Sequence, residues 1–219
     1  MKRALFAACV AALSIGVPTA LAKPASSSIS IAVGPRTVLF GWFTTLSGHV
    51  SGNKAPGAAV TLQAKLSGAT SYTGVATSFA SSAGNYSFRY YPLRDAVLRV
   101  VAKTSPTAST PGVFVRVKPS VGLTVGTTRP RKGQMVRFTG IVDPAFDGMV
   151  VWLQRRTATG HWRTRAATTL FAAPPGSQGP RSEYFRRVRI DRSGTFRVVF
   201  PAPSGWATNA SRTRTLIIH

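Results

Sequence analysis

The sequence predicts an all-β chain that consists of two tandem β-sandwich domains. The first observation is a pattern of alternating apolar residues that occurs twice. Its first copy is Leu46-x-Gly48, Val60-x-Leu62-Gln63, Tyr72 and Gly84-x-Tyr86-x-Phe88; its second is Phe138-x-Gly140, Val151-x-Leu153-Gln154, Trp162 and Gly194-x-Phe196-x-Val198. The second observation is that no window after the N-terminal segment keeps a 3.6-residue apolar period for the ten or more residues that a helix needs. Short alternating segments separated by Gly, Pro and Asn are typical of strands, and about seven per copy favour a sandwich over a closed barrel.

The N-terminal segment has the order of a secretory signal peptide. Lys2-Arg3 precedes an apolar stretch, and Ala20-Leu21-Ala22 supplies the small residues of a cleavage site, so we expect residues 1–22 to be removed. The alternative, an uncleaved membrane anchor, is disfavoured because Ser14, Gly16 and Pro18 interrupt a stretch shorter than the roughly 20 residues of a spanning helix. No second long apolar segment follows, which predicts a secreted or extracytoplasmic, cell-surface-associated protein without a transmembrane segment in the mature chain.

The only cysteine, Cys9, lies within this segment. The mature chain therefore has no disulfide, no thiolate nucleophile and no zinc–thiolate site, and each domain must be held together by its apolar core. The sequence predicts no cofactor and no metal.

The expected domain organisation follows from the repeat. We expect a flexible leader at 23–29, one sandwich at 30–118, a hinge at Pro119-Ser120 and a second sandwich at 121–219. The offset between matching residues is 90 from Tyr72 to Trp162 and 110 from Gly84 to Gly194, which indicates a 20-residue insertion in the second copy. Its centre is a Pro/Gly-rich loop near 172–182.

The motifs of the second copy resemble those of bacterial extracytoplasmic modules. The matching elements are Gly140-Ile-Val-Asp-Pro144, Gly148-Met-Val-Val-Trp-Leu-Gln154, Gly160-His-Trp162 and Asp191-Arg-Ser-Gly-Thr-Phe196-Arg-Val198. They are similar to the series in immunoglobulin-like or transthyretin-like domains, including the carboxypeptidase-regulatory-like type. The resemblance implies two tandem Ig-like (Greek-key) β-sandwich domains without catalytic activity, and it transfers no functional residues. In these motifs Gly84 and Gly194 are expected in tight turns with positive φ.

Charge is the strongest compositional signal. The chain has 28 Lys plus Arg against 5 Asp plus Glu, a formal net charge of +23. Such a chain attracts phosphate polymers, anionic glycans and acidic surfaces with strong salt dependence. The alternative is an arginine-rich composition whose solvated faces have no specific partner.

The residues of known catalytic sites are sparse. The mature chain has three histidines, His49, His161 and His219, and no Gly-x-Ser-x-Gly motif accompanies them, so we expect no hydrolase and no enzyme. Asp143 and Asp147 are close enough in sequence to contribute to a calcium site, although a plain turn is the favoured interpretation.

The second domain contains the residue types of a covalent crosslink between a lysine and an asparagine beside an acid. Lys132, Asn209 and Glu183 are the only plausible trio in the second domain. The turn-like Arg129-Pro-Arg-Lys-Gly133 predicts that Lys132 is exposed, which argues against the dry core that such a crosslink needs.

Arginines interleaved with aromatic residues form the candidate binding site. If the segments 164–171 and 184–190 pair, Arg187 and Arg189 point outward opposite part of the segment 163–165 and create a basic stripe. Trp162 is expected to pack between the sheets or across a strand pair. The candidate anion-binding residues are Arg155, Arg156, Arg163, Arg165, Arg186, Arg187 and Arg189.

The sequence thus favours a secreted, non-catalytic, basic β-sandwich protein that associates with anionic cell-envelope or extracellular material, a polymer or a glycan. The alternative is a structural or protein-interaction module whose charge is incidental and whose partners are proteins. Specific nucleic-acid binding is disfavoured, because the chain is expected to be exported and has no recognition helix.

Overall fold

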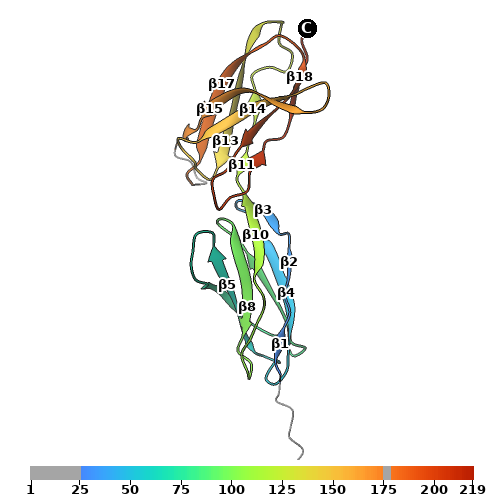
Figure 1. The fold of residues 1–219 in the computed structure, drawn as a ribbon, viewed down its shortest axis with the longest axis vertical. Helices are drawn as coiled ribbons and strands as arrows, with labels where there is room; N and C mark the ends of the chain where they lie inside the picture. The colour runs from blue at the N-terminus through green and yellow to red at the C-terminus, as the bar shows by residue number, and fades with distance from the viewer. Residues whose placement is uncertain (1–25, 175–178) are drawn as a thin grey trace, which may run out of the picture.

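Two β-sandwiches follow one another along the long axis of the molecule (Figure 1). The computed structural model describes residues 26–174 and 179–219. The predicted signal peptide and residues 23–25 of the predicted leader lie outside these residues, whereas Ser28–Ile29 of the leader form a strand that pairs with residues 50–51. Every regular element in the described residues is a strand, which confirms the predicted all-β sandwich fold. None of these residues forms a helix that is long and apolar enough to cross a membrane.

The first sandwich encloses an apolar core that includes Leu46, Leu62 and Leu98. One of its sheets contains β1 (Ser28–Ile29), β2 (Ala32–Gly34), β4 (Thr44–Ser51) and β7 (Asn85–Tyr90). The other contains β3 (Thr37–Leu39), β5 (Ala59–Leu66), β6 (Thr73–Phe79), β8 (Ala96–Ala102), β9 (Ala108–Ser109) and β10 (Val113–Lys118).

The second sandwich has its own core, which includes Phe138, Phe196 and Phe200. Its first sheet contains β11 (Ser120–Val121), β12 (Thr124–Val125), β13 (Gln134–Asp143), β16 (Phe171–Ala172) and β17 (Ser182–Ile190). Its second contains β14 (Val150–Arg156), β15 (Trp162–Thr169), β18 (Gly194–Phe200), β19 (Asn209–Ala210) and β20 (Arg214–Leu216).

Both sandwiches share one topology. In the first, β4 pairs with β7 and β5 pairs with β8. Between the two strands of each pair, the chain passes to the other sheet and back. In the second, β13 pairs with β17 and β14 with β18 in the same way. These crossovers are the Greek-key connections of a sandwich. Alternating burial along each central strand, as in β8, directs every second side chain into the core.

A buried tyrosine closes each sandwich in the same way. The hydroxyl of Tyr86 donates to the carbonyl oxygen of Ser30 at 2.5 Å, and that of Tyr184 donates to the carbonyl oxygen of Gly122 at 2.6 Å. Each tyrosine lies opposite a glycine, Gly48 or Gly140, where an added Cβ would collide with the same carbonyl oxygen and the hydroxyl. The glycines therefore let the leading strand approach closely enough to accept the hydrogen bond.

This equivalence corrects the predicted alignment of the two copies. The partner of Tyr86 is Tyr184 rather than Phe196, because the strand with Tyr184 pairs with the one with Gly140. The offset between equivalent residues grows from 90 (Tyr72 to Trp162) to 98 (Tyr86 to Tyr184), so the second copy is longer by eight residues at this point rather than 20. The added residues fall between β15 and β17, and 175–178 of the predicted loop lie outside the described residues.

A second set of contacts repeats on the outer face of each sandwich. Arg99 donates from Nε to Gln63 at 2.8 Å, and its guanidinium lies 3.9 Å from the ring centre of Tyr72. In the second sandwich the same contacts are made by Arg197, which donates to Gln154 at 3.0 Å and lies 4.2 Å from the ring centre of Trp162. Trp162 thus stacks beneath an arginine on its sheet and not between the sheets.

The junction between the sandwiches is hydrogen-bonded where the sequence predicts a hinge. Asp95 donates from its backbone to Gly205 at 2.9 Å and accepts at Oδ1 from the backbone of Val117 at 2.6 Å. The side-chain amide of Asn209 donates to the carbonyl oxygen of Pro119 at 2.7 Å. Trp206 packs against Phe40 of the first sandwich and Phe146 of the second, with ring centroids 5.7 and 5.3 Å away.

Removing the hydroxyl of Tyr86 should test the closing hydrogen bond. We expect Tyr86→Phe to lower the free energy of unfolding by about 1–3 kcal/mol, because the buried carbonyl of Ser30 loses its donor. Tyr91→Phe is the matched control, since Tyr91 is 52% exposed and keeps its ring against Phe43. Urea denaturation of both variants measures the difference, and an equal effect in the two would contradict the assigned role.

Alkaline pH should destabilise the protein through the same tyrosines. Burial raises the pKa of Tyr86 from 10.0 to about 12 and raises that of Tyr184 as well. The folded state holds these protons more tightly than the unfolded state, so stability is complete below about pH 10 and falls as pH rises toward 12. Urea midpoints between about pH 9 and pH 11.5 should show this decrease, and the Tyr86→Phe variant should show a smaller one.

Candidate anion-binding site

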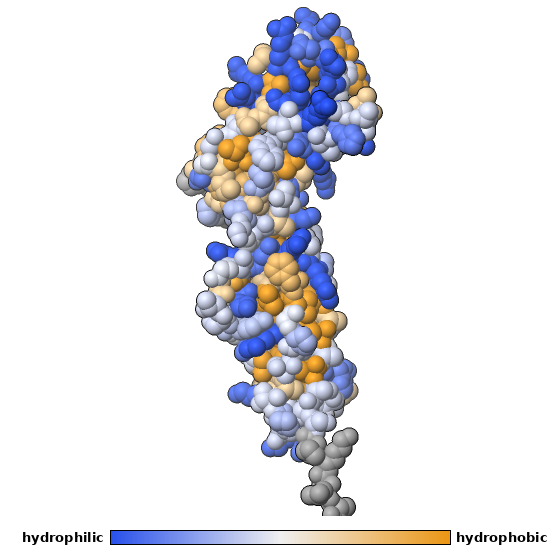
Figure 2. Space-filling view, in the orientation of Figure 1, coloured by the Kyte–Doolittle hydropathy of each residue, from blue (hydrophilic) through white to orange (hydrophobic). Residues whose placement is uncertain are grey.

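A cationic pocket opens between the two sheets of the second sandwich, at the end that is farther from the first sandwich. This end, called the distal end below, carries the turns at 129–133, 157–161 and 191–193. Hydrophilic side chains gather over it (Figure 2). The pocket has a volume of about 530 Å³ and lies between β14–β15 of one sheet and the end of β17 in the other. Its arginines are Arg155, Arg163, Arg165, Arg189 and Arg192.

Strand alternation and a β-bulge place three of these arginines. Val151 and Leu153 point into the core, so Arg155, two residues further along β14, lies at the next inward-facing position. Arg163 is directly opposite Arg155 on β15. The register shifts between Leu153 and Gln154, which leaves Arg165 as the extra residue of a bulge.

Arg155 is the central side chain of the pocket. It is half-buried, and one of its terminal nitrogens donates to the carbonyl oxygen of Ser193 at 2.8 Å. Its Nε is buried and has no hydrogen-bond partner among the described residues. Burial lowers the pKa of Arg155, and the positive charges of Arg192 and Arg165 lower it further. Bringing an anion into the pocket would offset this unfavourable environment.

Gly194 makes room for the Arg155 side chain. A Cβ at this position would collide with Nε of Arg155 and lie 3.2 Å from its Cζ. Gly194 starts β18 opposite Leu216, and its φ is not among the positive values, which corrects the prediction that it occupies a tight turn. Gly84 does have φ +79°. A glycine is needed at 194 because the Arg155 side chain occupies the space that a Cβ would fill, and not because the backbone has a positive φ.

The first sandwich shows what the same positions contain without a pocket. The facing residues Gln63 and Arg99 in the first sandwich are equivalent to Gln154 and Arg197 in the second. Counting one residue on from each glutamine, Ala64, which is 3% exposed, corresponds to Arg155. Counting three residues back from each arginine, Ala96 corresponds to Gly194. By the offset of 98, Val188 in the pocket wall corresponds to Tyr90. Small and aromatic core residues in one copy are therefore replaced by an arginine and a smaller wall residue in the other.

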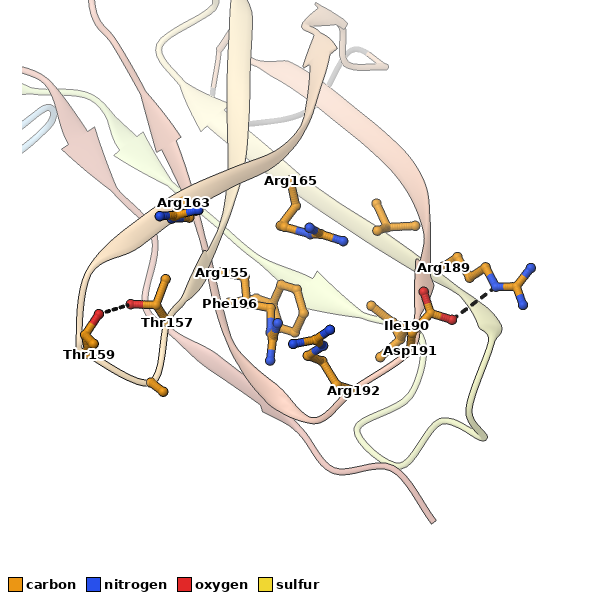
Figure 3. A pocket seen from close by; sticks show the side chains of 12 residues that line it. Arg155, Thr157, Thr159, Arg163, Arg165, Arg189, Ile190, Asp191, Arg192 and Phe196 are labelled. Atoms are coloured by element: carbon orange, nitrogen blue, oxygen red, sulfur yellow. Dashed lines mark hydrogen bonds and ion pairs between the residues drawn. The ribbon is translucent and has the colours of Figure 1, made fainter.

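The close view shows how the guanidinium groups are arranged (Figure 3). Those of Arg155, Arg165 and Arg192 lie within the pocket, whereas that of Arg189 points away and pairs with Asp191 at 3.1 Å. Both members of this ion pair are largely exposed, at 70% and 53%. It is the one side-chain ion pair in the described part of the chain, so the other pocket arginines have no carboxylate partner there.

Four of the seven predicted arginines line this pocket: Arg155, Arg163, Arg165 and Arg189. The other three lie elsewhere. Arg156 donates to the carbonyl oxygen of Gly160 within its hairpin, Arg186 borders a separate apolar cavity, and Arg187 lies on the outer face of β17. The sequence does not identify Arg192 as a member of this group. It belongs to a turn, where strand alternation does not predict which way a side chain points.

The predicted pairing of segments 164–171 and 184–190 is wrong. They lie mainly in β15 and β17, which belong to different sheets and pair with β14 and β13 respectively. The hydroxyl of Thr168 on β15 donates to the carbonyl oxygen of Phe185 on β17 at 3.1 Å, and nearer the distal end residues of both strands line the pocket. The pocket is therefore a gap between two sheets and not a stripe on one.

The other predicted constellations are separated or engaged in structural contacts. Lys132 precedes β13 at the distal end, whereas Asn209 bonds Pro119 at the junction, so the crosslink trio does not meet. Asp147 accepts a 2.5 Å hydrogen bond from Ser182 Oγ, which in turn accepts from the backbone of Phe146. No three His, Cys, Asp or Glu side chains converge in the described residues.

Comparison with known proteins gives no relative in sequence. No model of a known protein family matches the chain, and no curated protein does. Among solved structures, "Crystal structure of tetra-tandem repeat in extending region of large adhesion protein" is similar, with 18% identity and a TM-score of 0.36. The match covers 88% of this chain and 49% of that one, so this chain spans about half its length. At this score it supports no argument about function.

Replacing Arg155 and Arg197 separately should distinguish a binding residue from a structural one. We expect Arg155→Ala to leave the free energy of unfolding within about 0.5 kcal/mol of the native value or to raise it. The substitution removes a positive charge that is partly shielded from solvent and lies beside other positive charges. Arg197→Ala should lower it by about 1–2 kcal/mol, because Gln154 and Trp162 lose their partner. Urea denaturation in Tris chloride measures both, and a large loss in Arg155→Ala would assign that residue to stability.

Proposed function

We propose that this protein is a secreted, non-catalytic β-sandwich protein that binds anionic groups of cell-envelope or extracellular polymers in the distal arginine pocket. The observation that carries the proposal is Arg155, an arginine at an inward-facing strand position for which Gly194 supplies the room. An arginine kept in a cationic, partly desolvated place costs stability without benefit unless an anion is bound there. Binding sites commonly carry such a cost.

The pocket chemistry suits oxyanions. A guanidinium presents a planar fork of donors that binds two oxygens of a phosphate, sulfate or carboxylate at once. Arg155, Arg165 and Arg192 present three such groups to one space, with hydroxyls of Thr157 and Thr159 at its margin. The net charge of +23 would also draw a polyanion toward the chain over a range set by the salt concentration.

The finer fold type and the localisation belong to the same proposal. We assign both sandwiches to the Ig-like type, because their sheets are joined by Greek-key crossovers around alternating inward residues. The domain limits 30–118 and 121–219 and the signal peptide at 1–22 are proposed from the sequence. The basic start, apolar stretch and small residues at 20–22 support export.

Non-catalytic function is supported by the placement of the histidines. His49 lies in β4, His161 lies in the hairpin between β14 and β15, and His219 is the last residue, and among the described residues no three His, Cys, Asp or Glu side chains form a cluster. A general base needs a nucleophile or a polarised water within hydrogen-bond reach. The arginine pocket contains donors only, apart from Asp191 and hydroxyl groups, which fits binding better than catalysis.

The rival function is a protein-interaction module. It is favoured by the free edge of β6 in the first sandwich, where Phe79 is 70% exposed and Val75 is 41% exposed. An edge strand can pair with a strand of another protein. Such an interface would depend little on salt, whereas counterion release makes polyanion binding strongly salt-dependent.

Binding of fluorescently labelled long-chain inorganic polyphosphate, followed by anisotropy over a sodium chloride series, tests the proposal. We expect the logarithm of affinity to fall linearly and steeply with the logarithm of salt concentration. Arg155→Ala/Arg165→Ser should weaken binding about tenfold or more at fixed salt, since two charge-assisted contacts are lost. Arg36→Ser/Lys103→Ser, which removes two exposed charges from the first sandwich, is the control and should have a small effect.

A variant with unchanged charge sharpens this test. Gly194→Ala should displace Arg155 from the pocket and weaken polyphosphate binding severalfold while leaving the net charge unchanged. Equal losses in the pocket and control variants, with none in Gly194→Ala, would show that the charge acts without a site. Salt-independent or absent binding would favour the protein-interaction module.

A further inference from the structure

The outer face of the second sandwich carries another pair of arginines. Arg137 on β13 and Arg187 on β17 lie directly opposite one another, and both are exposed. Together they line a second, open pocket of about 300 Å³ next to the backbone of Gly126. Arg137 also lies 5.4 Å from the ring centre of Phe185, which holds its guanidinium over this sheet.

Two cross-strand pairs of like charge in one sandwich are unusual in physical terms. Like charges directly opposite each other destabilise a sheet. Arg155 faces Arg163 in one sheet, and Arg137 faces Arg187 in the other. Within the described residues, none of these four arginines forms an ion pair with a carboxylate. Each pair would be stabilised by an oxyanion placed between its two guanidinium groups.

One small anion cannot serve both pairs. The two sheets of a sandwich lie about 10 Å apart, and the outer pair lies on the far side of its sheet from the pocket. A guanidinium contacts an oxyanion at about 2.8 Å. Two anionic groups are therefore needed, and these bind more tightly if they are parts of the same molecule.

Arg189 lies on the path between the two pairs. It is two residues from Arg187 on the same face of β17, about 7 Å along the strand. It is one of the residues that line the first pocket, and its guanidinium lies beside Gly133, just before β13. The free side of β17 is paired with β16 at Ser182 and Glu183 and contacted by Thr168 of β15 at Phe185, so among the described residues no strand pairs with it beside Arg187 and Arg189.

We propose that the ligand is a linear polymer of repeated tetrahedral oxyanions, phosphate or sulfate, that runs from the distal pocket past Arg189 to the outer pair Arg137–Arg187. This inference rests on the proposed function, since the pocket is the first of its two anchoring points. It adds a second site and requires a ligand long enough to reach both. Inside the pocket one anionic group replaces water around Arg155, and a later group of the same chain binds between Arg137 and Arg187.

A length series measures this directly. The full chain is titrated by isothermal calorimetry with inorganic phosphate, tripolyphosphate and long-chain polyphosphate, at one ionic strength and with concentrations counted per phosphate. We expect long-chain polyphosphate to bind at least about tenfold more tightly than tripolyphosphate, because the second contact is intramolecular. A parallel titration with dextran sulfate distinguishes the two chemistries, and tighter binding of one identifies it as the source of the oxyanion.

Variants separate the second site from the first. Arg137→Ser/Arg187→Ser should weaken long-chain binding about tenfold and leave tripolyphosphate binding within about twofold, because only the longer ligand reaches that pair. The control Arg36→Ser/Lys103→Ser should change neither. Far-ultraviolet circular dichroism and urea midpoints equal to those of the native chain show that both variants fold.

The outcomes of the two proposals differ. If the native chain binds long-chain polymer, and Arg155→Ala/Arg165→Ser weakens it, but neither ligand length nor Arg137→Ser/Arg187→Ser matters, the second site is wrong and the pocket stands. If no phosphate or sulfate probe binds the native chain, the proposed function fails and the second site fails with it.

Discussion

The period of two along a β-strand is the constraint on which the second sandwich depends. Every second side chain on β14 must enter the space between the sheets, so Arg155 follows Val151 and Leu153 inward whether or not it is apolar. A guanidinium in that space must keep access to solvent or acquire an anion. The gap between β15 and β17 supplies this access, and the absence of a Cβ at Gly194 supplies the room. The pocket is the consequence of one charged residue at one core-facing position.

The repeat provides an internal comparison that a single domain would lack. Both sandwiches keep the buried tyrosine that bonds the leading strand, and both keep the glutamine–arginine–aromatic contact on the outer face. These shared features hold the fold, because they recur wherever the same strands meet. The difference that creates the pocket lies at the end of the core, where Ala64 and Ala96 of the first sandwich correspond to Arg155 and Gly194 of the second. A change that leaves the shared framework intact is what adding a site to an existing fold requires.

Alternation and turn residues were sufficient to predict the strands, but not which strand pairs with which. A glycine followed by an aromatic and then an apolar residue at every second position is compatible with any strand that has one buried face. The sequence therefore aligns Gly194-x-Phe196 with Gly84-x-Tyr86, whereas in the structure β18 is the counterpart of β8. Pairing depends on contacts between segments far apart in the chain. For the same reason the sequence identifies Arg155, Arg163, Arg165 and Arg189 as members of one candidate group but pairs the segment around Arg163 and Arg165 with that of Arg189, although these strands belong to different sheets. Arg192 lies in a turn, and only the structure shows that this turn lies beside Arg155.

The junction and the pocket lie at opposite ends of the second sandwich, and this separation affects how the first sandwich contributes. Backbone hydrogen bonds of Asp95 with Gly205 and of Ala207 with Val117 hold the two sandwiches together, while β18 extends from Gly194 beside the pocket to Phe200 at the junction end. The first sandwich therefore contacts neither the pocket nor the outer arginine pair, and three of its five arginines, Arg89, Arg99 and Arg116, lie against aromatic rings. It holds the second sandwich with the cationic end turned away from the junction. A polyanion would then meet the pocket from the side that the first sandwich does not obstruct.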